Sequence, residues 1–590
     1  MRTRHALGFA ALVSTIGLTS SFGFADTAVD APTEKLKQSN AAQVTMVASG
    51  AKRGRIDGDM RLRYPGFEQT TIVASKGHLV LITMESVQEP NRGPVQCSCS
   101  SYELRADGPP REVVSLKRLT DYTNGERTCN HPKAAADEKG NIVWVYGSDG
   151  PVNGQNQNRP NTYAGILNEK CEHLASPQMV SIPRDANDGA PDISYLGNGR
   201  FVAGYYSDGG GEAVGFPEPG GDYSVAMGLS ITGAGLLPEL QRAWIAPVVT
   251  PTNIGRPTVA ALSADRAIFC APKGPNRPSD SVECALINTA GGAEIAPEAR
   301  ILTKNEFFKG GNGGGNGGGN GNGGGRKYFN QPTVAKVGDN QIALMAVESN
   351  GMGKGTNMKG SNVAHMMMIE RIGDTLSPRG TIVGAAAHQT HASICVGGYG
   401  EQGATAVGVF SAAPTGIGRA SMAMVQYDNA AKAFHYDPSQ DLWPAAWYGD
   451  SGHLSNWYGR NPMRQGRDYM RCIGGVENPG YHQPNGYMAD VKTFFAAAVH
   501  GRIPGDEKNS LFLSLVPGHM DKKPLPQNPV PAGETPNLDP DTSKADSNGP
   551  AADSGCGCAT PGTSSTTGTA ALAGLALAAG IVISRRRRSA

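Results

Sequence analysis

The sequence predicts an all-β protein whose main body, residues 26–520, is a β-propeller of seven blades, each with three to four antiparallel strands. Glycine and proline are abundant, with 79 and 40 of 590 residues, and only 18% of the residues are charged. This composition favours turns over long helices, and the body contains no long apolar pattern of helical period with caps. Short apolar runs separated by turn residues recur instead, which is typical of antiparallel meanders.

Each repeated unit opens on a motif with proline, or threonine in its place, before an apolar run. Clear copies span residues 130–136, 189–194, 255–260 and 330–335, and looser copies span 68–74, 388–393 and 482–487. Measured at the proline or its equivalent, the steps are 62 (70→132), 59 (132→191), 66 (191→257), 75 (257→332), 58 (332→390) and 94 (390→484). Units of this size indicate a propeller, in which each blade buries its faces against its neighbours.

After the opening motif each unit continues with a turn and two further apolar runs. In the second unit these are NIVWVYGS and TYAGILN, and most units add a fourth run such as PQMVSI. The seventh unit lacks this fourth run. The segment Gln43–Ala48 is suited to complete its sheet and join the ends of the ring, which would remove an exposed edge. Six or eight blades remain alternatives, as does a pair of β-sandwich domains.

The N-terminus has the pattern of a secretory signal peptide. A basic start is followed by the apolar stretch Ala6–Leu18 and by small residues that end at Ala25. We therefore expect residues 1–25 to be cleaved after Ala25 and the rest of the chain to be exported.

The C-terminus, residues 556–590, has the layout of a sorting signal. Cys556-Gly557-Cys558 precedes a Thr/Ser-rich spacer, the uncharged segment Ala570–Ile583, and four arginines that begin with Arg585 and Arg586. A helix over the uncharged segment would be ~21 Å long, and extension back to Gly562 would let it span a ~30 Å hydrocarbon core. The arginines would then stay on the cytoplasmic side.

This tail resembles the MYXO-CTERM sorting signal of myxobacterial surface proteins. The resemblance implies processing near Cys556 and Cys558 by export and sorting machinery, and it implies that the mature protein is held at the cell surface in the bacterial outer envelope. An ordinary transmembrane helix that is retained is the alternative.

Two segments are too poor in apolar residues to fold. Residues 521–555 are rich in Pro, Asp and Ser, so we expect a disordered linker between the propeller and the tail. The Gly/Asn tract 310–325 is expected to be a flexible loop. It lacks the Lys-Ser/Thr ending and the strand-to-helix context of a phosphate-binding loop.

The body contains eight cysteines: Cys97, Cys99, Cys129, Cys171, Cys270, Cys284, Cys395 and Cys472. An even number in an exported protein favours disulfides over a metal site. Cys270 and Cys284 lie on neighbouring apolar runs joined by a Gly/Pro/Ser/Asp loop, so we expect them to pair across a hairpin. The sequence leaves the partners of the other six open.

Composition and motifs argue against several functions. The net charge of +1 indicates no nucleic-acid partner. No nucleophile elbow, zinc-protease helix or calcium loop is present, so no metal or cofactor is predicted. Arg502-Ile503-Pro504 matches a triplet of sialidases, but their Ser-x-Asp-x-Gly-x-Thr-Trp boxes are missing and we interpret the match as coincidence. The run Met366–Met368 is interpreted as strand core.

Three carboxylates near the starts of predicted inner strands are candidates for lining the channel of the propeller: Asp188, Asp192 and Asp490. A glycosidase would keep its two carboxyl groups there. The simpler interpretation is that they cap turns.

The aromatic-rich insertion 440–487 contains the candidate ligand-binding residues: Trp443, Trp447, Tyr448, Asp450, Trp457 and Arg460. Long insertions on a rigid scaffold often carry recognition, and aromatic faces beside polar groups suit sugars or peptides. The alternative is that these rings form a small satellite core.

These features predict an exported, surface-anchored propeller that acts as a binding or interaction module rather than an enzyme. Its expected partners are the membrane, the export machinery and an extracellular glycan or peptide. The alternatives are a polysaccharide-directed hydrolase or lyase that uses the channel, and a structural envelope protein.

Overall fold

The computed structural model describes β structure in twenty-three stretches of the chain. These are residues 43–48, 55–56, 60–61, 67–86, 95–108, 110–120, 129–149, 160–182, 188–207, 223–233, 237–249, 256–273, 281–290, 294–303, 327–350, 363–386, 393–398, 405–412, 420–428, 433–436, 470–480, 493–502 and 509–517. In these stretches no helix is long and apolar enough to cross a membrane. The predicted signal peptide, linker and sorting tail lie outside them, as do residues 440–469 of the aromatic insertion.

The described strands form seven four-stranded antiparallel sheets and one two-stranded sheet. The first three sheets are β4 (Phe67–Ser75), β5 (His78–Ser86), β6 (Val95–Glu103) and β7 (Arg111–Arg118); β8 (Asn130–Ala136), β9 (Ile142–Asp149), β10 (Pro160–Leu167) and β11 (His173–Met179); and β12 (Asp188–Gly197), β13 (Arg200–Ser207), β14 (Tyr223–Thr232) and β15 (Glu239–Val249). The fourth and fifth are β16 (Thr258–Ser263), β17 (Arg266–Lys273), β18 (Ser281–Asn288) and β19 (Glu294–Thr303); and β20 (Lys327–Gly338), β21 (Gln341–Asn350), β22 (Val363–Ile372) and β23 (Thr375–Ala386).

The sixth sheet is β24 (Ser393–Gly398), β25 (Thr405–Ala412), β26 (Ala420–Asp428) and β27 (Ala433–Tyr436). The seventh combines β28 (Met470–Glu477), β29 (Thr493–Arg502) and β30 (Asn509–Pro517) with β1 (Gln43–Ala48). The two-stranded sheet is β2 (Arg55–Ile56) with β3 (Met60–Arg61).

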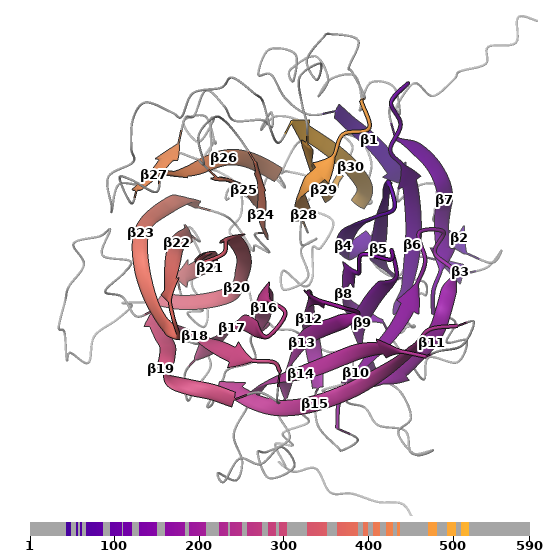
Figure 1. Cartoon of the computed structure of the whole chain (residues 1–590). Helices are drawn as coiled ribbons and strands as arrows, with labels where there is room; N and C mark the ends of the chain where they lie inside the picture. Colours follow the sequence, from indigo (N-terminus) through magenta and orange to yellow (C-terminus); the bar gives the residue numbers. More distant parts are fainter. Residues whose placement is uncertain are drawn as a thin grey trace, which may run out of the picture.

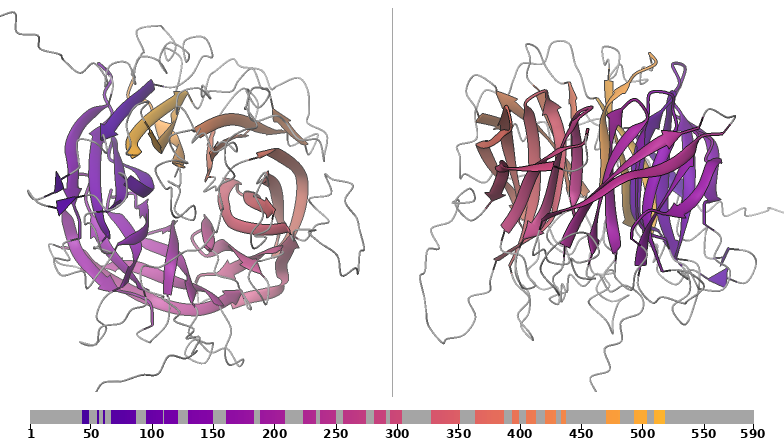
Figure 2. Two further views of the ribbon diagram at one scale, coloured as in Figure 1. Left: turned by 180° about the vertical axis from the view of Figure 1, so that it is seen from behind. Right: turned by 60° about the horizontal axis from the view of Figure 1, so that its bottom comes forward.

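The sheets stand side by side around a common centre, and their strands run between the two faces of the ring (Figures 1 and 2). The first strand of each sheet contacts the first strand of the next, from β4 through to β28, and β28 also contacts β4. In the seventh sheet β1 pairs antiparallel with β30, so an N-terminal strand completes this sheet as predicted. The arrangement is a β-propeller-like fold.

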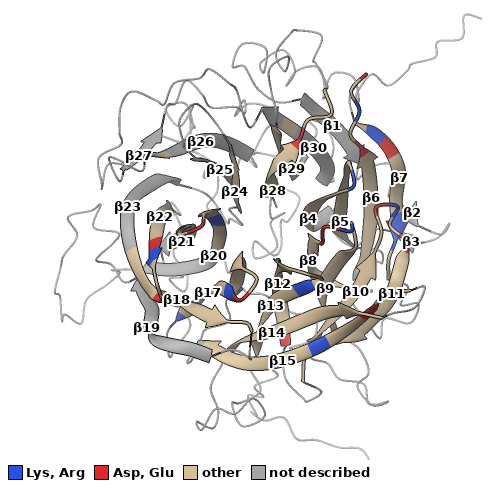
Figure 3. Ribbon diagram, viewed as in Figure 1, with Lys and Arg blue, Asp and Glu red and all other residues tan. Residues whose placement is uncertain are grey.

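The core lies between consecutive sheets. Because side chains alternate between the two faces of a strand, one strand contributes to the interfaces with both neighbouring sheets. On β5, Leu79 and Leu81 pack with Phe494 of the seventh sheet, whereas Val80 and Ile82 pack toward the second sheet. Successive side chains of a strand point to opposite faces, so a strand that is buried on both faces is apolar almost throughout. Charged residues of both signs are scattered around the ring (Figure 3).

The repeated proline motif forms a bulge on the first strand of several sheets. On β8, Asn130 pairs with Gly147 and Lys133 with Val145, so the segment across Pro132 carries one extra residue. The same shift occurs in β12 across Pro191 and in β20 across Pro332. Proline has no N–H for a sheet ladder, and a bulge is one of the few places where a strand tolerates it.

The side chain of the residue after this proline accepts a hydrogen bond from the next sheet. Asp192 Oδ2 accepts a hydrogen bond from the Val259 N–H at 3.1 Å, and Thr258 Oγ1 accepts one from the Val334 N–H at 3.2 Å. A first strand pairs with another strand on only one edge, so N–H groups on its other edge need different acceptors. These side chains supply them, which gives the polar residue of the motif a structural role.

Four disulfides link the described cysteines. Cys97–Cys129 and Cys99–Cys171 join the first and second sheets, and Cys395–Cys472 joins β24 to β28. Cys270–Cys284 joins directly opposed residues of β17 and β18, the hairpin pair expected from the sequence.

One predicted element is wrong in position. The seventh unit opens on β28, not on residues 482–487, which lie outside the described residues, so the insertion does not extend through 470–477. The bulge of β28 falls at Gly474-Gly475, between the pairs Ile473–Ala496 and Val476–Phe494. Two glycines replace the proline motif in this strand, so the motif gives no signal there.

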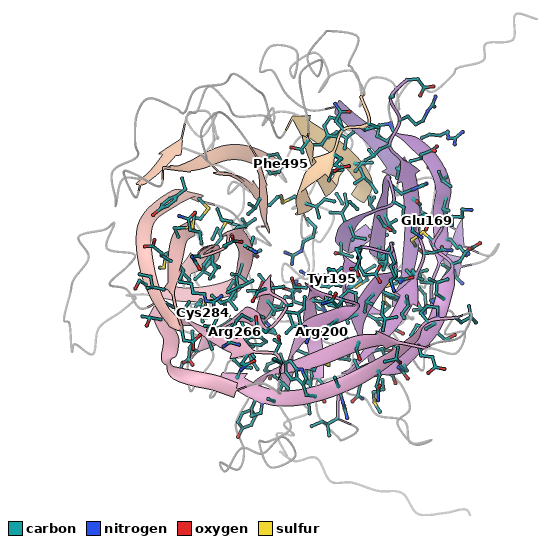
Figure 4. The ribbon with its side chains drawn as sticks, in the orientation of Figure 1. Glu169, Tyr195, Arg200, Arg266, Cys284 and Phe495 are labelled. Carbon is teal, nitrogen blue, oxygen red and sulfur yellow. A yellow bond between two sulfur atoms is a disulfide. The ribbon has the colours of Figure 1, made fainter. Side chains whose placement is uncertain are left out.

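Replacing Gly474 by alanine should destabilise the fold, because β24 and β28 approach closely at this point. A Cβ at Gly474 would lie 2.1 Å from the Val396 carbonyl oxygen, and Phe495 of β29 packs against the neighbouring Gly397 (Figure 4). Overpacking typically costs about 1–3 kcal/mol. Gly108→Ala is the control, because no atom lies within 4 Å of its Cβ position. Equal denaturation midpoints for the two variants would contradict the close approach.

Candidate functional site

Charged side chains from separate sheets come together near the bulges of the first strands. We call His131, Lys133, Asp192, Arg256 and Arg471 the central charged cluster. His131 and Lys133 belong to β8, Asp192 to β12 and Arg471 to β28, and Arg256 lies two residues before β16.

Asp192 forms the ion pair of the cluster and also bonds to a neighbouring strand. Its Oδ1 lies 3.5 Å from Lys133 Nζ, and its Oδ2 accepts the Val259 N–H described above. The Lys133 and Asp192 side chains are only 15% and 16% exposed, so the ion pair is largely shielded from water. Asp192 therefore binds groups from the second and the fourth sheet.

His131 and Arg256 form the second contact. The Arg256 guanidinium, which can only donate, hydrogen-bonds to Nε2 of His131. His131 lies in the left-handed region at φ 56°, directly before Pro132 in the bulge. Bulges redirect side chains and are frequent beside functional sites.

The cluster carries an excess of positive charge. Burial lowers the pKa of Lys133 to about 7; the nearby Arg471 and Arg256 lower it as well, whereas Asp192 raises it. Burial also lowers the pKa of Arg471, and Asp192 opposes that shift. When Lys133 is protonated, the three cations Lys133, Arg256 and Arg471 exceed the one carboxylate by two charges. Such an arrangement can attract and orient an anion.

The structure places two of the three predicted carboxylates on β12. Asp192 belongs to the cluster and binds across sheets rather than capping a turn. Asp188 is fully buried at the start of the strand, and its backbone oxygen accepts a hydrogen bond from Thr162 Oγ1 at 2.6 Å. Asp490 lies outside the described residues.

Most other predicted site residues also lie outside the described part of the chain: Ala25, Trp443, Trp447, Tyr448, Asp450, Trp457, Arg460, Cys556, Cys558, Arg585 and Arg586. Met366, Met367 and Met368 are buried on β22, which confirms that they are strand core. Arg502 ends β29. Among the described residues, no group of three or more His, Cys, Asp and Glu could hold a metal ion.

Sequence reasoning did not identify Lys133, Arg256 and Arg471 as site residues. A signal for the first two was present in the motif. The residue after the proline is threonine at 258 and 333 but lysine at 133, and the residue before it is a cation at 256. Arg471 had no such signal, because β28 lacks the motif.

No protein-family profile matches the sequence, and no curated protein is similar to it. Solved structures give distant matches. A Dyadobacter fermentans protein of unknown function has 8% identity and a TM-score of 0.36, over 79% of this chain and 99% of that one. Trypanosoma rangeli sialidase in complex with sialic acid has 6% identity and a TM-score of 0.35, over 80% and 58%.

A third match is the GH93 alpha-L-arabinofuranosidase of Fusarium graminearum, with 9% identity and a TM-score of 0.35, over 70% of this chain and 97% of that one. In the match with the sialidase, this chain covers little more than half of the length of that protein. All three TM-scores are below 0.5, so the likenesses carry no argument about the function of this chain.

Proposed function

We propose that this protein is an exported, surface-anchored propeller, closed by seven blades, that binds an extracellular glycan or peptide. The patterns of residues 1–25 and 556–590 support export and anchoring. The pairing of β1 with β30 and the apolar cluster shared by the first and seventh sheets support closure of the ring.

The observation that carries the binding function is the central charged cluster. Three cations close together in a largely buried place destabilise a fold, because one carboxylate does not balance their charge, and perturbed charges gather at functional sites. A charge is not required at the motif position of Lys133, because Thr258 performs the inter-sheet role of this position without one.

An array of glycans and peptides, probed with the purified full chain, tests this function. We expect selective capture of at least one ligand by folded protein. An empty array, obtained with protein whose thermal unfolding is cooperative, would contradict the binding function and leave a structural role.

The hydrolase or lyase alternative has less support from the described residues. Glycosidases use two carboxyl groups about 5–10 Å apart across the scissile bond, and Asp192 is already bound by Lys133 and by the Val259 N–H. Release of reducing sugars from a captured glycan would favour this alternative.

The anchor gives a separate prediction. If Cys556 and Cys558 direct processing, replacing both by alanine should leave protein that keeps its arginine tail, whereas the native mature protein should be shorter. Intact-mass measurement of both proteins decides this. A native C-terminus at Ala590 would instead support a retained membrane span.

A further inference from the structure

We propose that the central charged cluster binds the anionic group of an acidic sugar, a carboxylate or a sulfate, so that the ligand is an acidic polysaccharide. This inference rests on the proposed binding function and names the class of its ligand.

Lys133 departs from the scaffold role of its motif position. At the same motif position Asp192 and Thr258 accept an N–H from the next sheet. A lysine ammonium has no acceptor, so Lys133 cannot do this, and it pairs with the Asp192 carboxylate instead. Its presence adds a charge that the repeat does not need.

Arg471 has unused hydrogen-bonding capacity. Its Nε is shielded from solvent and has no hydrogen-bond partner among the described residues. A guanidinium presents a planar fork of N–H donors that matches the oxygens of a carboxylate or sulfate. An anion placed between Arg471 and Lys133 would satisfy donors on both and reduce their mutual repulsion.

The cluster lies on the face of the ring that carries the longer connections. The bulges of β8 and β12 lie on the face of the ring where one sheet is joined to the next. On the opposite face, two-residue turns such as 198–199 and 264–265 join the first strand of a sheet to its second strand. On the bulge face the connection is longer: β13 ends at Ser207 and β14 begins only at Tyr223. Binding residues usually gather where a scaffold carries its longer connections.

The first strands also explain why a sugar acid fits better than an extended peptide. Peptides commonly add to a sheet through free N–H groups on an edge strand. On β16 the N–H groups of Val259 and Ala261 already bond to Asp192 and Ser194, and on β20 that of Val334 bonds to Thr258. A compact anionic sugar needs only the side-chain donors.

Calorimetry with the purified full chain at pH 6 tests the inference. The probes are an oligogalacturonate, a sulfated oligosaccharide, a neutral oligosaccharide of equal length and a glutamate-rich peptide. We expect the carboxylate or the sulfate probe to bind and the neutral one not to bind, and the two acidic probes tell the two anions apart. Lys133→Gln and Arg471→Gln should each weaken binding about tenfold, the effect of one charged hydrogen bond. Arg111→Gln, which removes an exposed arginine of β7, should leave binding unchanged.

The affinity should also depend on pH. The charged groups that act on Lys133 are Arg471, Asp192 and Arg256, and its pKa of about 7 means that it loses its charge as the pH rises. Binding should therefore weaken from pH 6 to pH 8.5 in the wild type, and much less in Lys133→Arg.

Equal binding of the neutral and acidic probes, or unchanged binding in both variants, would overturn this inference while leaving a binding function in place. Binding only to a glutamate-rich peptide would overturn it too. If Arg471→Gln does not fold, competition by inorganic sulfate on the wild type replaces it. Sulfate should displace the acidic probe more strongly than chloride at equal ionic strength, and failure to do so would overturn the inference.

Discussion

Replacing Trp144 by alanine is expected to lower the free energy of unfolding by about 3–5 kcal/mol, the usual cost of emptying a large aromatic site in a core. Trp144 on β9 is fully buried between the first and second sheets, and its ring stacks on Tyr146 with centroids 4.5 Å apart. Gly165 lies opposite on β10, where a Cβ would come within 2.9 Å of the indole nitrogen. The surrounding strands are paired on both sides, so they have little freedom to fill the cavity.

Trp244 provides a matched control, because it also lies across from a glycine, Gly228. It belongs to the outermost strand β15 and is only partly buried, so Trp244→Ala should cost clearly less. Chemical denaturation of both variants gives the comparison. Similar losses for the two would show that the interface between the first and second sheets is not the tightly packed core described above.

The second large effect is expected for Asp192→Asn. The amide can still accept the Val259 N–H, but it no longer compensates the charge of Lys133 or Arg471. Removing one partner of a buried ion pair costs about 3–5 kcal/mol. We expect about 2–3 kcal/mol here, because each side chain of the pair keeps some contact with water. The double variant Lys133→Met with Asp192→Asn should recover part of this loss.

The loss should depend on pH in a defined direction. Folding lowers the pKa of Lys133 from 10.5 to about 7. Between these values the unfolded chain binds more protons at this site, so the free energy of unfolding rises with pH. The stability that Lys133 contributes as a neutral amine is therefore fully present above pH 10.5 and is lost as the pH falls through 7. At pH 9 Lys133 is mostly neutral in the folded wild type, so its attraction to the Asp192 carboxylate contributes less to stability. The cost of Asp192→Asn should therefore be larger at pH 6 than at pH 9, and the opposite trend would contradict the assignment of charges.

The sequence predicted the strands best where local signals repeat. The proline motif, a two-residue turn and an apolar run are all local, and they located the opening strands of the second to fifth units. The pairing of β1 with β30 was also predicted, because the seventh unit visibly lacked a strand. The opening of that unit was misplaced, since β28 makes its bulge with Gly474-Gly475 and carries no proline.

The site was predicted only in part, because its residues belong to different sheets and are brought together by the packing of the sheets, not by closeness in sequence. Lys133 and Arg471 are far apart in sequence, and only the contacts among first strands bring β8 and β28 toward one centre. The sequence makes Asp192 a candidate channel carboxylate, with turn capping as the simpler interpretation, but its partners depend on inter-sheet register that no local pattern contains. The hydrogen bond from Val259 to Asp192 shows this register directly.

A crystal structure of the full chain with the acidic oligosaccharide that binds best is the direct test of the anion site. We expect the carboxylate or sulfate to lie within hydrogen-bonding distance, about 3.2 Å or less, of both Lys133 Nζ and the Arg471 guanidinium. A ligand held on the outer strands, with no anion contacting Lys133, Arg256 or Arg471, would contradict it.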